Sequence, residues 1–456
     1  MKYTRKPFSY SPTVNHLGSF FDQNICCVFE TDRTAKVYHP KTIIALDPLV
    51  EFSGFSNRIE VQIHNTSFSH LLNSFEFEQT FYTEAAGEIL RKYLAVHKST
   101  NAEFNGLYGL FGFEFINEYY PIKRHQNAKD VNDFHLYHFG TYIVYEHDKQ
   151  TAFIETCVDG SVEKYTSLFK THFDEDSFYV EDVTISPSKE EFTKHIENVR
   201  RLCSKGEIYE TVLARQINAT FKGSHFELFK SYKAQNPSPY MFFVNLGKNE
   251  YMLGASPEMM IRVQNSYVEI RPISGTAKRG KTPFEDHENM MDLLNSVKEK
   301  SELDMLIDLA RNDLNRVCEP NLEITDYRHV EKYSQVMHTV AHIKGKLQSN
   351  KTAFDALIAC LNAGTLTGAP KIAAMNVIAS MEHAPRGYYG GCVGYLGFNG
   401  NCDSAILIRS AHIKNGYIDY KSGVTLLYDS VPESEYEESQ QKALAFVKSL
   451  NVEELV

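Results

Sequence analysis

Apolar residues recur at helical spacing in the segment that follows residue 187. One face of this segment carries Phe192, Ile196, Val199 and Leu202. These residues stand three or four positions apart, which is the period of a helix face that packs against a core. Ser188 and Glu191 have the spacing of a capping box, and Gly206 stands where helices commonly end. The pattern predicts a helix between Ser188 and Gly206, followed by a strand in "YETVLARQINATF".

Continuous and alternating apolar runs predict strands in much of the remaining chain. The first 160 residues contain runs such as "GLYGLFGFEF" and "HFGTYIVYEHD". Two Asn-Gly steps, at 399–400 and 415–416, lie between apolar runs and are typical of hairpin turns. One long helical stretch is expected between the strand blocks, at 284–316. Its apolar side would consist of Met291, Leu294, Val297, Leu306 and Leu309.

These patterns indicate an α+β fold with mainly antiparallel sheets. A boundary is expected near the end of segment 160–187, which is rich in Asp, Glu and Ser and only weakly periodic. The expected regions are therefore an N-terminal one, 1–185, and a second one, 186–456.

Composition narrows the function classes. The 456 residues carry a formal net charge of −11 without a run of Lys or Arg, so nucleic acid is not an expected partner. No apolar window approaches the length that spans a membrane, and a cytosolic location is expected. The eight cysteines form no CxxC pair, which argues against a zinc knuckle or a disulfide framework. Most of them are expected to be reduced and buried.

The acidic stretch "DSVPESEYEES", residues 429–439, contains carboxylates of two kinds. Ser430 and Glu433 have the form of a helix start, with Ser430 as the cap. Glu435 and Glu438 stand three positions apart on one helical face, where like charges repel unless water or a cation intervenes.

Glu299 and Glu302 in "KEKSELD" repeat this spacing on the other predicted helix. If the two helices converge, four carboxylates surround one point. Hard oxygen ligands that leave positions open for water and substrate suit Mg²⁺. The alternative is that both faces are simply solvated, as charged helix faces usually are.

Three other motifs have both a functional and a structural interpretation. Cys392 in "GGCVG" has the form of a nucleophile elbow, but a hairpin follows it, which favours a strand residue. His338 and His342 in "HTVAH" have the spacing of a zinc helix, but the segment is β-rich, and a strand separates them too far for one metal. Arg409 is expected inside an apolar strand, "AILIRSA", and there it needs an anionic partner, either a structural acid or a substrate carboxylate.

Ten segments resemble, in the same order, the chorismate-utilising enzymes, specifically the large subunits of anthranilate synthase and aminodeoxychorismate synthase. They are "GEIYETVLARQ", "NPSPYMFF", "GASPEM", "RPISGTAKRG", "KEKSELDMLIDLARNDL", "YSQVMHTVAHIKG", "AGTLTGAPKIAAM", "RGYYGGCVGYLGF", "AILIRSA" and "YDSVPESEYEESQQKA". The likeness runs from residue 185 to the C-terminus and is weaker before it. It implies large antiparallel sheets packed as a sandwich, with helices on the outside.

The resemblance also implies roles at the ring of the substrate, chorismate. Glu302 and Glu438 would bind Mg²⁺ directly, and Glu299 and Glu435 would act mainly through water. The metal would hold the ring carboxylate. The residues expected beside that carboxylate are Gly275, Thr276, Gly423 and Lys442.

At the other end of the substrate, the resemblance implies that Tyr389 and Arg409 hold the enolpyruvyl carboxylate, with Thr365 adjacent. Glu258 would be the general acid that protonates the departing C4 hydroxyl, and His338 would line that side. These residue types suit the chemistry, because a buried dianion needs a cation at each carboxylate and hydroxide leaves only with a proton.

Two positions bear on the nucleophile. Family members that add water carry a lysine base where this chain has Glu210, and glutamate or glutamine there goes with ammonia. Ser274 replaces the lysine with which aminodeoxychorismate synthases attack C2 covalently. The expected reaction is direct amination at C2 by ammonia, followed by loss of pyruvate to give anthranilate. A separate glutaminase subunit is the expected source of ammonia.

Alternatives stay open on the product. Thr425 stands where the family has a glycine next to the ring carboxylate, and its side chain favours an enzyme that stops at 2-amino-2-deoxyisochorismate. An aminodeoxychorismate synthase of the folate pathway is another alternative. A non-catalytic relative that binds chorismate or tryptophan is an alternative of a different class, against which the intact Glu258, His338 and Arg409 argue.

Feedback inhibition by tryptophan is a further expectation from the resemblance. "NPSPYM" matches the form in which this stretch helps to bind tryptophan, and its N-terminal counterpart is "VFET", residues 28–31. The residues expected at this site are Glu30, Thr31, Asn236, Pro237, Ser238, Tyr240 and Met241.

Overall fold

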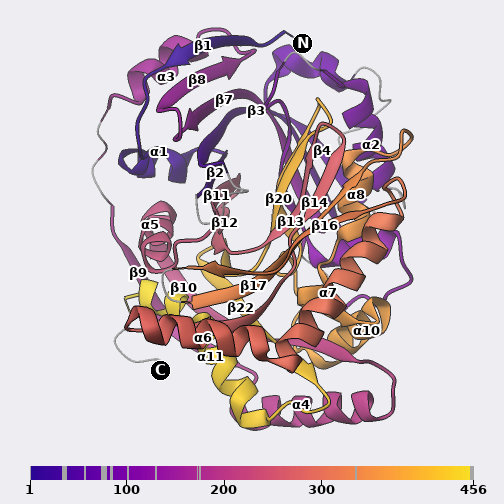
Figure 1. Ribbon diagram of the computed structural model, residues 1–456. Helices are drawn as coiled ribbons and strands as arrows, with labels where there is room; N and C mark the ends of the chain where they lie inside the picture. Colours follow the sequence, from indigo (N-terminus) through magenta and orange to yellow (C-terminus); the bar gives the residue numbers. More distant parts are fainter. Residues whose placement is uncertain are drawn as a thin grey trace.

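The computed structural model describes residues 2–32, 39–55, 58–72, 80–82, 86–99, 102–128, 131–171, 173, 176–333 and 336–451. In this part of the chain the strands of one extended sheet pair in antiparallel fashion. The sheet curves through the molecule, and most helices lie on its outer side (Figure 1). The α+β fold expected from the sequence, with antiparallel sheets and outer helices, is confirmed.

The N-terminal part is built around two long strands that pair with each other. Its strands are β1 (Thr4–Phe8), β2 (Cys26–Thr31), β3 (Lys41–Phe55), β4 (Arg58–Ile63), β5 (Thr80–Tyr82), β6 (Gly106–Phe111), β7 (Phe134–Glu146) and β8 (Thr151–Thr156). Its helices are α1 (Gly18–Gln23), α2 (Ala86–Val96), α3 (Ser161–Leu168) and the 3-10 turns η1 (Asn15–Leu17), η2 (Thr66–Leu72) and η3 (Phe113–Glu118).

The second part contains the remaining elements. Its strands are β9 (Phe178–Ser186), β10 (Glu210–Gly223), β11 (Tyr240–Gly247), β12 (Glu250–Ser256), β13 (Met259–Gln264), β14 (Tyr267–Ile270), β15 (Ile273–Lys278), β16 (Glu323–Lys332), β17 (Val336–Lys346), β18 (Gly368–Ala369), β19 (Cys392–Gly397), β20 (Cys402–Ile406), β21 (Ser410–Lys414) and β22 (Tyr417–Leu427). Its helices are α4 (Lys189–Ser204), α5 (His225–Gln235), α6 (Pro283–Asn295), α7 (Val297–Asn315), α8 (Ala353–Cys360), α9 (Gly364–Thr367), α10 (Lys371–Met381) and α11 (Pro432–Ser449).

Two strand pairs join the parts: β2 pairs with β11, and β6 pairs with β19. The boundary expected near residue 185 stays a prediction.

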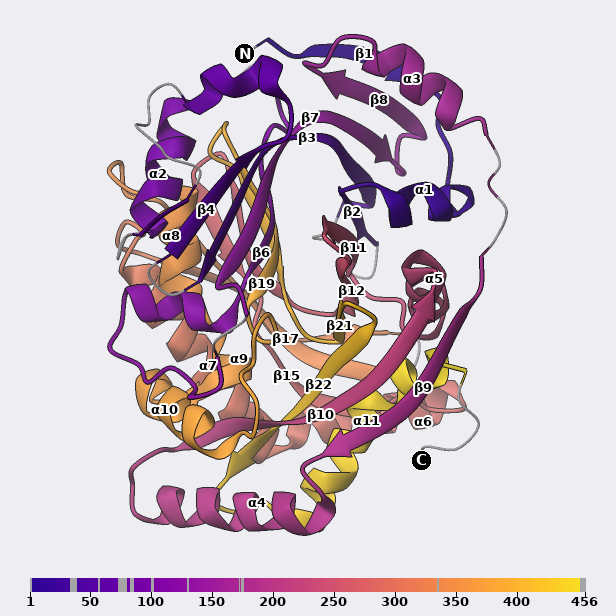
Figure 2. The same cartoon turned by 180° about the vertical axis from the view of Figure 1, so that it is seen from behind.

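The β10–β22 ladder and helix α11 form one packed unit. β10 and β22 pair from Glu210–Leu427 to Thr220–Tyr417, and α4 and α11 lie beneath them (Figure 2). Phe446 of α11 stacks on Tyr420 of β22, with ring centroids 4.1 Å apart and both side chains fully buried. Burying a phenylalanine contributes about 1.5–3 kcal/mol, so this contact fixes the helix that carries Glu435 and Glu438.

Several local predictions are confirmed. Ser188 and Glu191 form a capping box at the start of α4. Asn415 and Gly416 both have positive φ in the turn between β21 and β22, as a two-residue hairpin turn requires. Cys392 is a buried strand residue of β19, and all eight cysteines are free. None of the described helices is long and apolar enough to cross a membrane.

The single long helix expected at 284–316 is wrong, because the segment forms two helices. Ser296 has an extended backbone (φ −64°, ψ 118°), and its hydroxyl accepts a hydrogen bond from Glu299 N. This cap ends α6 and begins α7. Val297, assigned to the apolar side, is consequently 77% exposed, whereas Leu306 is buried as expected.

Two further local predictions are wrong. Val431, not Ser430, is the N-cap residue of α11, and the Ser430 hydroxyl accepts a hydrogen bond from Leu427 N instead. Arg409 lies between β20 and β21 and not inside a strand, and its backbone is left-handed (φ 49°).

Candidate active site

Glu258 is a buried carboxyl group at the start of β13. It is 8% exposed, and Thr365 Oγ1, from α9, donates a hydrogen bond to Glu258 Oε1 at 3.0 Å. Burial raises the pKa of Glu258 to about 8, and the Thr365 hydroxyl and the charge of Lys442 offset only part of this effect. The group therefore carries a proton at neutral pH and can donate it.

His338 and Gly275 adjoin each other on paired strands β17 and β15. His338 Nδ1 donates to Gly275 O at 2.9 Å and lies 3.1 Å from Thr276 Oγ1. Burial lowers the pKa of His338, which favours a neutral ring whose Nε2 is an acceptor. Gly275 has φ +67°, and a Cβ there would lie 2.8 Å from Glu299 Oε2. The glycine thus gives the Glu299 carboxylate room against the strand.

Glu302 lies beside Glu299 on the face of α7 that looks toward β15. Burial raises the pKa of Glu302, and the charge of Glu299 raises it further. The hydroxyl of Ser274 and the charges of Lys298 and Lys442 act in the opposite direction. Glu302 is therefore a half-buried acid whose protonated form is favoured by its surroundings.

Glu435 and Glu438 are the second pair of acids at i, i+3 spacing, and they lie on α11. Burial raises the pKa of Glu435, the Ser430 hydroxyl lowers it, and Glu438 raises it. Lys442 Nζ forms an ion pair with Glu438 Oε1 at 2.7 Å and donates to Gly423 O at 3.1 Å. Lys298 and Lys442 act on both Glu302 and Glu435. The two acidic helix starts therefore face the same pair of lysines.

The paired strands β10 and β22 form another side of the candidate site. Val212 is paired with Thr425, and Glu210 stands two residues before Val212 on the same face of β10. A Cβ on Gly423 would lie 2.9 Å from Val212 Cγ1 and 2.5 Å from the Tyr389 hydroxyl. The Tyr389 hydroxyl thus lies directly over Gly423, in line with Thr425 and Glu210 on one surface.

Arg409 is half-buried at the turn between β20 and β21. Its charge lowers the pKa of His338, so the guanidinium lies within electrostatic reach of that ring. Within the described residues no carboxylate forms an ion pair with Arg409. Of the two partners expected from the sequence, the structural acid is absent from this part of the chain.

Arg386 and Glu382 are buried residues of the site that the sequence did not single out. They form an i, i+4 ion pair at 2.7 Å. The Arg386 guanidinium also donates to Leu366 O at 2.5 Å and Val212 O at 2.7 Å, while Glu382 Oε1 accepts from Ala214 N at 2.9 Å. The pair thereby joins α9, which carries Thr365, to β10. No motif signals this role, since it depends on backbone carbonyls that only the fold brings together.

The four glutamates are ligands of the type that divalent cations prefer, but they do not form a complete coordination shell. Across the described ranges, no three His, Cys, Asp or Glu side chains gather closely enough to hold a metal by themselves. The convergence of four carboxylates on one point is therefore not observed. Mg²⁺ commonly takes only one or two protein carboxylates and completes its shell with water and substrate oxygens. The two glutamate pairs can supply that number of carboxylates.

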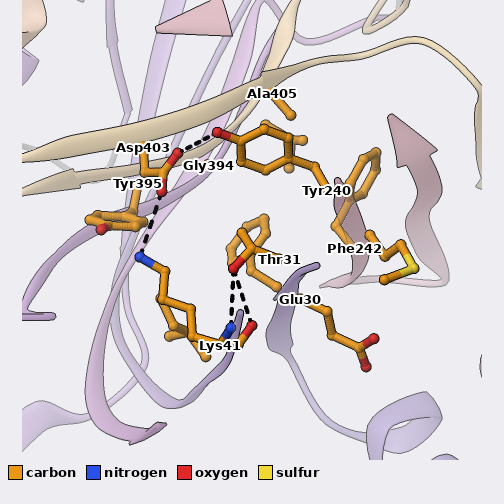
Figure 3. A pocket seen from close by; sticks show the side chains of 13 residues that line it. Glu30, Thr31, Lys41, Tyr240, Phe242, Gly394, Tyr395, Asp403 and Ala405 are labelled. Carbon is orange, nitrogen blue, oxygen red and sulfur yellow. Dashed lines mark hydrogen bonds and ion pairs between the residues drawn. The ribbon is translucent and has the colours of Figure 1, made fainter. Parts of the chain in front are cut away.

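The segments expected to bind tryptophan lie side by side elsewhere in the fold. Tyr240 pairs with Thr31 and Met241 with Glu30 across β11 and β2. These four residues line a pocket of about 350 Å³, open mouth included, together with Lys41, Tyr395 and Asp403 (Figure 3).

Inside this pocket, the Tyr240 hydroxyl donates a hydrogen bond to Asp403 Oδ1 at 2.8 Å, and Lys41 Nζ lies 3.6 Å from Asp403 Oδ2. The carboxylate of Glu30 is directed away from that pair and bonds to Lys233 at 2.8 Å (Figure 3).

The three other residues of the expected tryptophan site, 236–238, are not part of the pocket lining. Asn236 Nδ2 donates to Ala255 O at 3.1 Å, and Ser238 Oγ donates to Asn236 O at 3.1 Å. Their bonds stabilise the turn that leads into β11.

We expect Glu258 to make the stability of the folded chain fall as pH rises. The folded pKa, about 8, lies above the ordinary value of 4.5, so the folded state holds a proton that the unfolded state loses over this window. Between about pH 5 and pH 8 the free energy of unfolding should fall by a few kcal/mol more in the wild type than in Glu258→Gln. Urea unfolding at a series of pH values measures this.

The matched control is Glu207→Gln, an exposed acid between α4 and β10, which should leave the wild-type pH dependence unchanged. Parallel pH dependences for the wild type and Glu258→Gln would contradict the assignment of a protonated buried carboxyl.

Comparisons with known proteins agree with the fold and with the segments that resemble a family. The model of the chorismate binding enzyme family matches residues 27–448. Anthranilate synthase component 1 of Acetivibrio thermocellus is 33% identical, over 94% of this chain and 91% of that protein.

Two solved structures share the fold. Anthranilate synthase component I from Streptococcus pneumoniae superposes with a TM-score of 0.76 at 28% identity, over 89% of this chain and 92% of that one. The menaquinone-specific isochorismate synthase from Escherichia coli superposes with a TM-score of 0.75 at 17% identity, over 99% and 94%. By its sequence and its fold, the chain belongs to the family of chorismate-binding enzymes.

Proposed function

We propose that the chain catalyses the Mg²⁺-dependent amination of chorismate at C2, followed by pyruvate elimination to give anthranilate for tryptophan synthesis. The observation that carries the proposal is the buried carboxyl group of Glu258, whose pKa of about 8 keeps it protonated. Replacing the C4 hydroxyl of chorismate requires such an acid, because hydroxide is a poor leaving group. The similarity to anthranilate synthase component 1 supports the same class of reaction.

The two carboxylates of chorismate fit the two ends of the site. Arg409, which has no carboxylate partner in the described chain, would take the enolpyruvyl carboxylate together with the Tyr389 hydroxyl. Gly275, Thr276 and Lys442 would adjoin the ring carboxylate. The neutral His338 ring would accept a hydrogen bond near the departing hydroxyl.

Glu302 and Glu438 would hold Mg²⁺, and Glu299 and Glu435 would support it through water. When bound, Mg²⁺ supplies the positive charge that neutralises the ring carboxylate. The raised pKa values of Glu302 and Glu435 support this assignment, since both acids lack sufficient positive charge around them.

Ammonia from a separate glutaminase subunit is the proposed nucleophile. Glu210 offers no basic amine to activate water, and Ser274 cannot attack C2 as a lysine would, so nitrogen adds directly at C2. Glu258 gives its proton to the C4 oxygen, which leaves as water while the C2–N bond forms.

Thr425 favours a second candidate, in which the product is 2-amino-2-deoxyisochorismate. Its side chain shares a surface with Gly423 and Val212, next to the proposed position of the ring carboxylate. A methyl and hydroxyl group there alter how the aminated ring sits for the loss of pyruvate.

The direct test is an assay of the purified chain with chorismate, Mg²⁺ and ammonium chloride at about pH 8, with product masses recorded. We expect anthranilate, and a fall of kcat/KM of about a hundredfold or more in Glu258→Gln. Because the free enzyme must carry the proton on Glu258, kcat/KM should also fall above about pH 8.

Glu207→Gln is the matched control and should retain full activity. An aminated product that retains the pyruvyl group would select the second candidate. Failure to consume chorismate under any of these conditions would contradict an enzyme and leave the non-catalytic relative.

We also propose that tryptophan inhibits the enzyme by binding in the pocket between β2, β11 and β19 (Figure 3). The apolar lining from Phe29, Ile43 and Met241 suits an indole ring, and Asp403 and Lys41 offer opposite charges for the amino and carboxylate groups. The pocket and the active site share no residue, so inhibition would act at a distance.

Tryptophan at millimolar concentration should abolish most of the ammonium-dependent activity of the wild type. Met241→Lys places a charge in the apolar part of the pocket and should weaken inhibition about tenfold or more, with basal activity retained. Calorimetric titration of both proteins with tryptophan measures the binding itself. Undiminished wild-type activity at saturating tryptophan would contradict the proposal.

A further inference from the structure

Strand β10 pairs with β22 along one edge, but its other edge is paired only in part. On that edge β18 pairs with Glu210 and Thr211, and β9 pairs from Gln216 onward. No described strand pairs with residues 212–215 on this edge. Because buried backbone groups need hydrogen-bond partners, the groups in this gap must be satisfied by something other than a strand.

The side chains of Arg386 and Glu382 fill the gap. The Arg386 guanidinium donates to Val212 O at 2.7 Å, and Glu382 Oε1 accepts from Ala214 N at 2.9 Å. A carbonyl and an N–H of this kind are the groups that a neighbouring strand would bond. Arg386 is 2% exposed, and its ion pair with Glu382 measures 2.7 Å. The pair is therefore a buried substitute for a strand.

The same guanidinium also holds the helix that carries Thr365. Arg386 donates to Leu366 O at 2.5 Å, and Leu366 follows Thr365 on α9. Thr365 Oγ1 in turn donates to Glu258 Oε1 at 3.0 Å. Since α9 has only four residues, it forms a single turn, and its position depends on bonds to neighbouring elements.

A second side-chain bond between α9 and β10 is weaker. It runs from Thr211 Oγ1 to Thr367 O at 3.2 Å and joins two neutral groups, whereas a charged donor forms a stronger hydrogen bond. A lysine at residue 386 would keep the charge but not the several donors of the planar guanidinium, because it carries one ammonium group on a flexible stem. The position of α9 therefore depends on an arginine at residue 386.

We propose that Arg386 and Glu382 are positioning residues for the acid step, which fix α9 on β10 so that the Thr365 hydroxyl stays on the Glu258 carboxyl group. This inference rests on the proposed function. Because Oε1 of Glu258 accepts the Thr365 hydroxyl, the proton of the neutral carboxyl group is left on Oε2, from which it passes to the C4 oxygen. The pair thus controls the rate of proton transfer more than the affinity for chorismate.

The first test is the steady-state kinetics of Arg386→Lys in the full chain, with chorismate, Mg²⁺ and ammonium chloride. We expect kcat to fall about tenfold or more, with the KM for chorismate changed less than about threefold. Glu382→Gln, which keeps an oxygen for Ala214 N, should have a smaller effect in the same direction. Arg311→Lys is the control and should match the wild type, because Arg311 forms an exposed ion pair with Asp308 on α7.

A double-mutant cycle with Thr365→Val tests whether Arg386 acts through Thr365. If it does, adding Arg386→Lys to Thr365→Val should lower kcat by less than about a further twofold. Losses that multiply in the double variant would overturn the proposal, as would a raised KM for chorismate with unchanged kcat in Arg386→Lys. Thermal midpoints show whether each variant is folded, and Glu382→Gln decides the question if Arg386→Lys is not.

The titration of Glu258 gives a readout that does not need turnover. The Thr365 hydroxyl and the charge of Lys442 hold the pKa of Glu258 below the value that burial alone would give. The carboxyl absorption of Glu258, isolated as an infrared difference against Glu258→Gln, should therefore titrate at higher pH in both Arg386→Lys and Thr365→Val than in the wild type. An unchanged titration in Arg386→Lys would overturn the inference. Failure of the proposed function is distinguished by a wild type that consumes no chorismate.

Discussion

Burying several acids close together is the constraint on which the site depends. In water each carboxyl group would be ionised, but inside the fold their mutual repulsion and the loss of hydration favour the protonated form. Glu258 meets this constraint by keeping its proton, with one hydroxyl group from Thr365 as its partner. Glu302 and Glu435 meet it only in part, through Lys298 and Lys442. At this end of the site the chain therefore leaves negative charge uncompensated.

Arg409 presents the opposite situation at the other end. Its guanidinium has no carboxylate partner in the described residues, so this end lacks negative charge. A ligand that brings a carboxylate to Arg409, and a second carboxylate together with a cation to the glutamates, satisfies both ends at once. The scaffold keeps the two ends of the site in fixed positions, because Arg386 bonds α9 to β10 and Phe446 fixes α11 on β22.

The features that local sequence decides were predictable. A capping box needs only Ser188 and Glu191, and a hairpin turn needs only an Asn-Gly step with its positive φ values. The i, i+3 glutamate pairs were likewise evident from spacing, although spacing did not reveal that the charges of Lys298 and Lys442 act on an acid of each pair. The break at Ser296 was missed because a serine within a helical pattern does not by itself indicate a helix boundary. Only the structure shows that its hydroxyl accepts a hydrogen bond from Glu299 N and so caps a new helix.

Features set by long-range contacts could not be predicted from the residues themselves. The turn at Arg409 and the Glu382–Arg386 pair depend on carbonyls and strands that lie far away in sequence. The pairing of β2 with β11, which creates the pocket lined by Tyr240 and Asp403, also joins distant segments. Here the resemblance to a known family indicated the right stretches, because it carries information on tertiary contacts that periodicity does not.

We expect the acidic end of the site to accept a carboxylate only together with a divalent cation. Calorimetric titration of the Glu258→Gln protein with chorismate tests it most directly, because that variant should bind the substrate without converting it. One chorismate should bind per chain in the presence of Mg²⁺, and binding should weaken about tenfold or more when Mg²⁺ is removed by a chelator. Equal affinity with and without Mg²⁺ would contradict it.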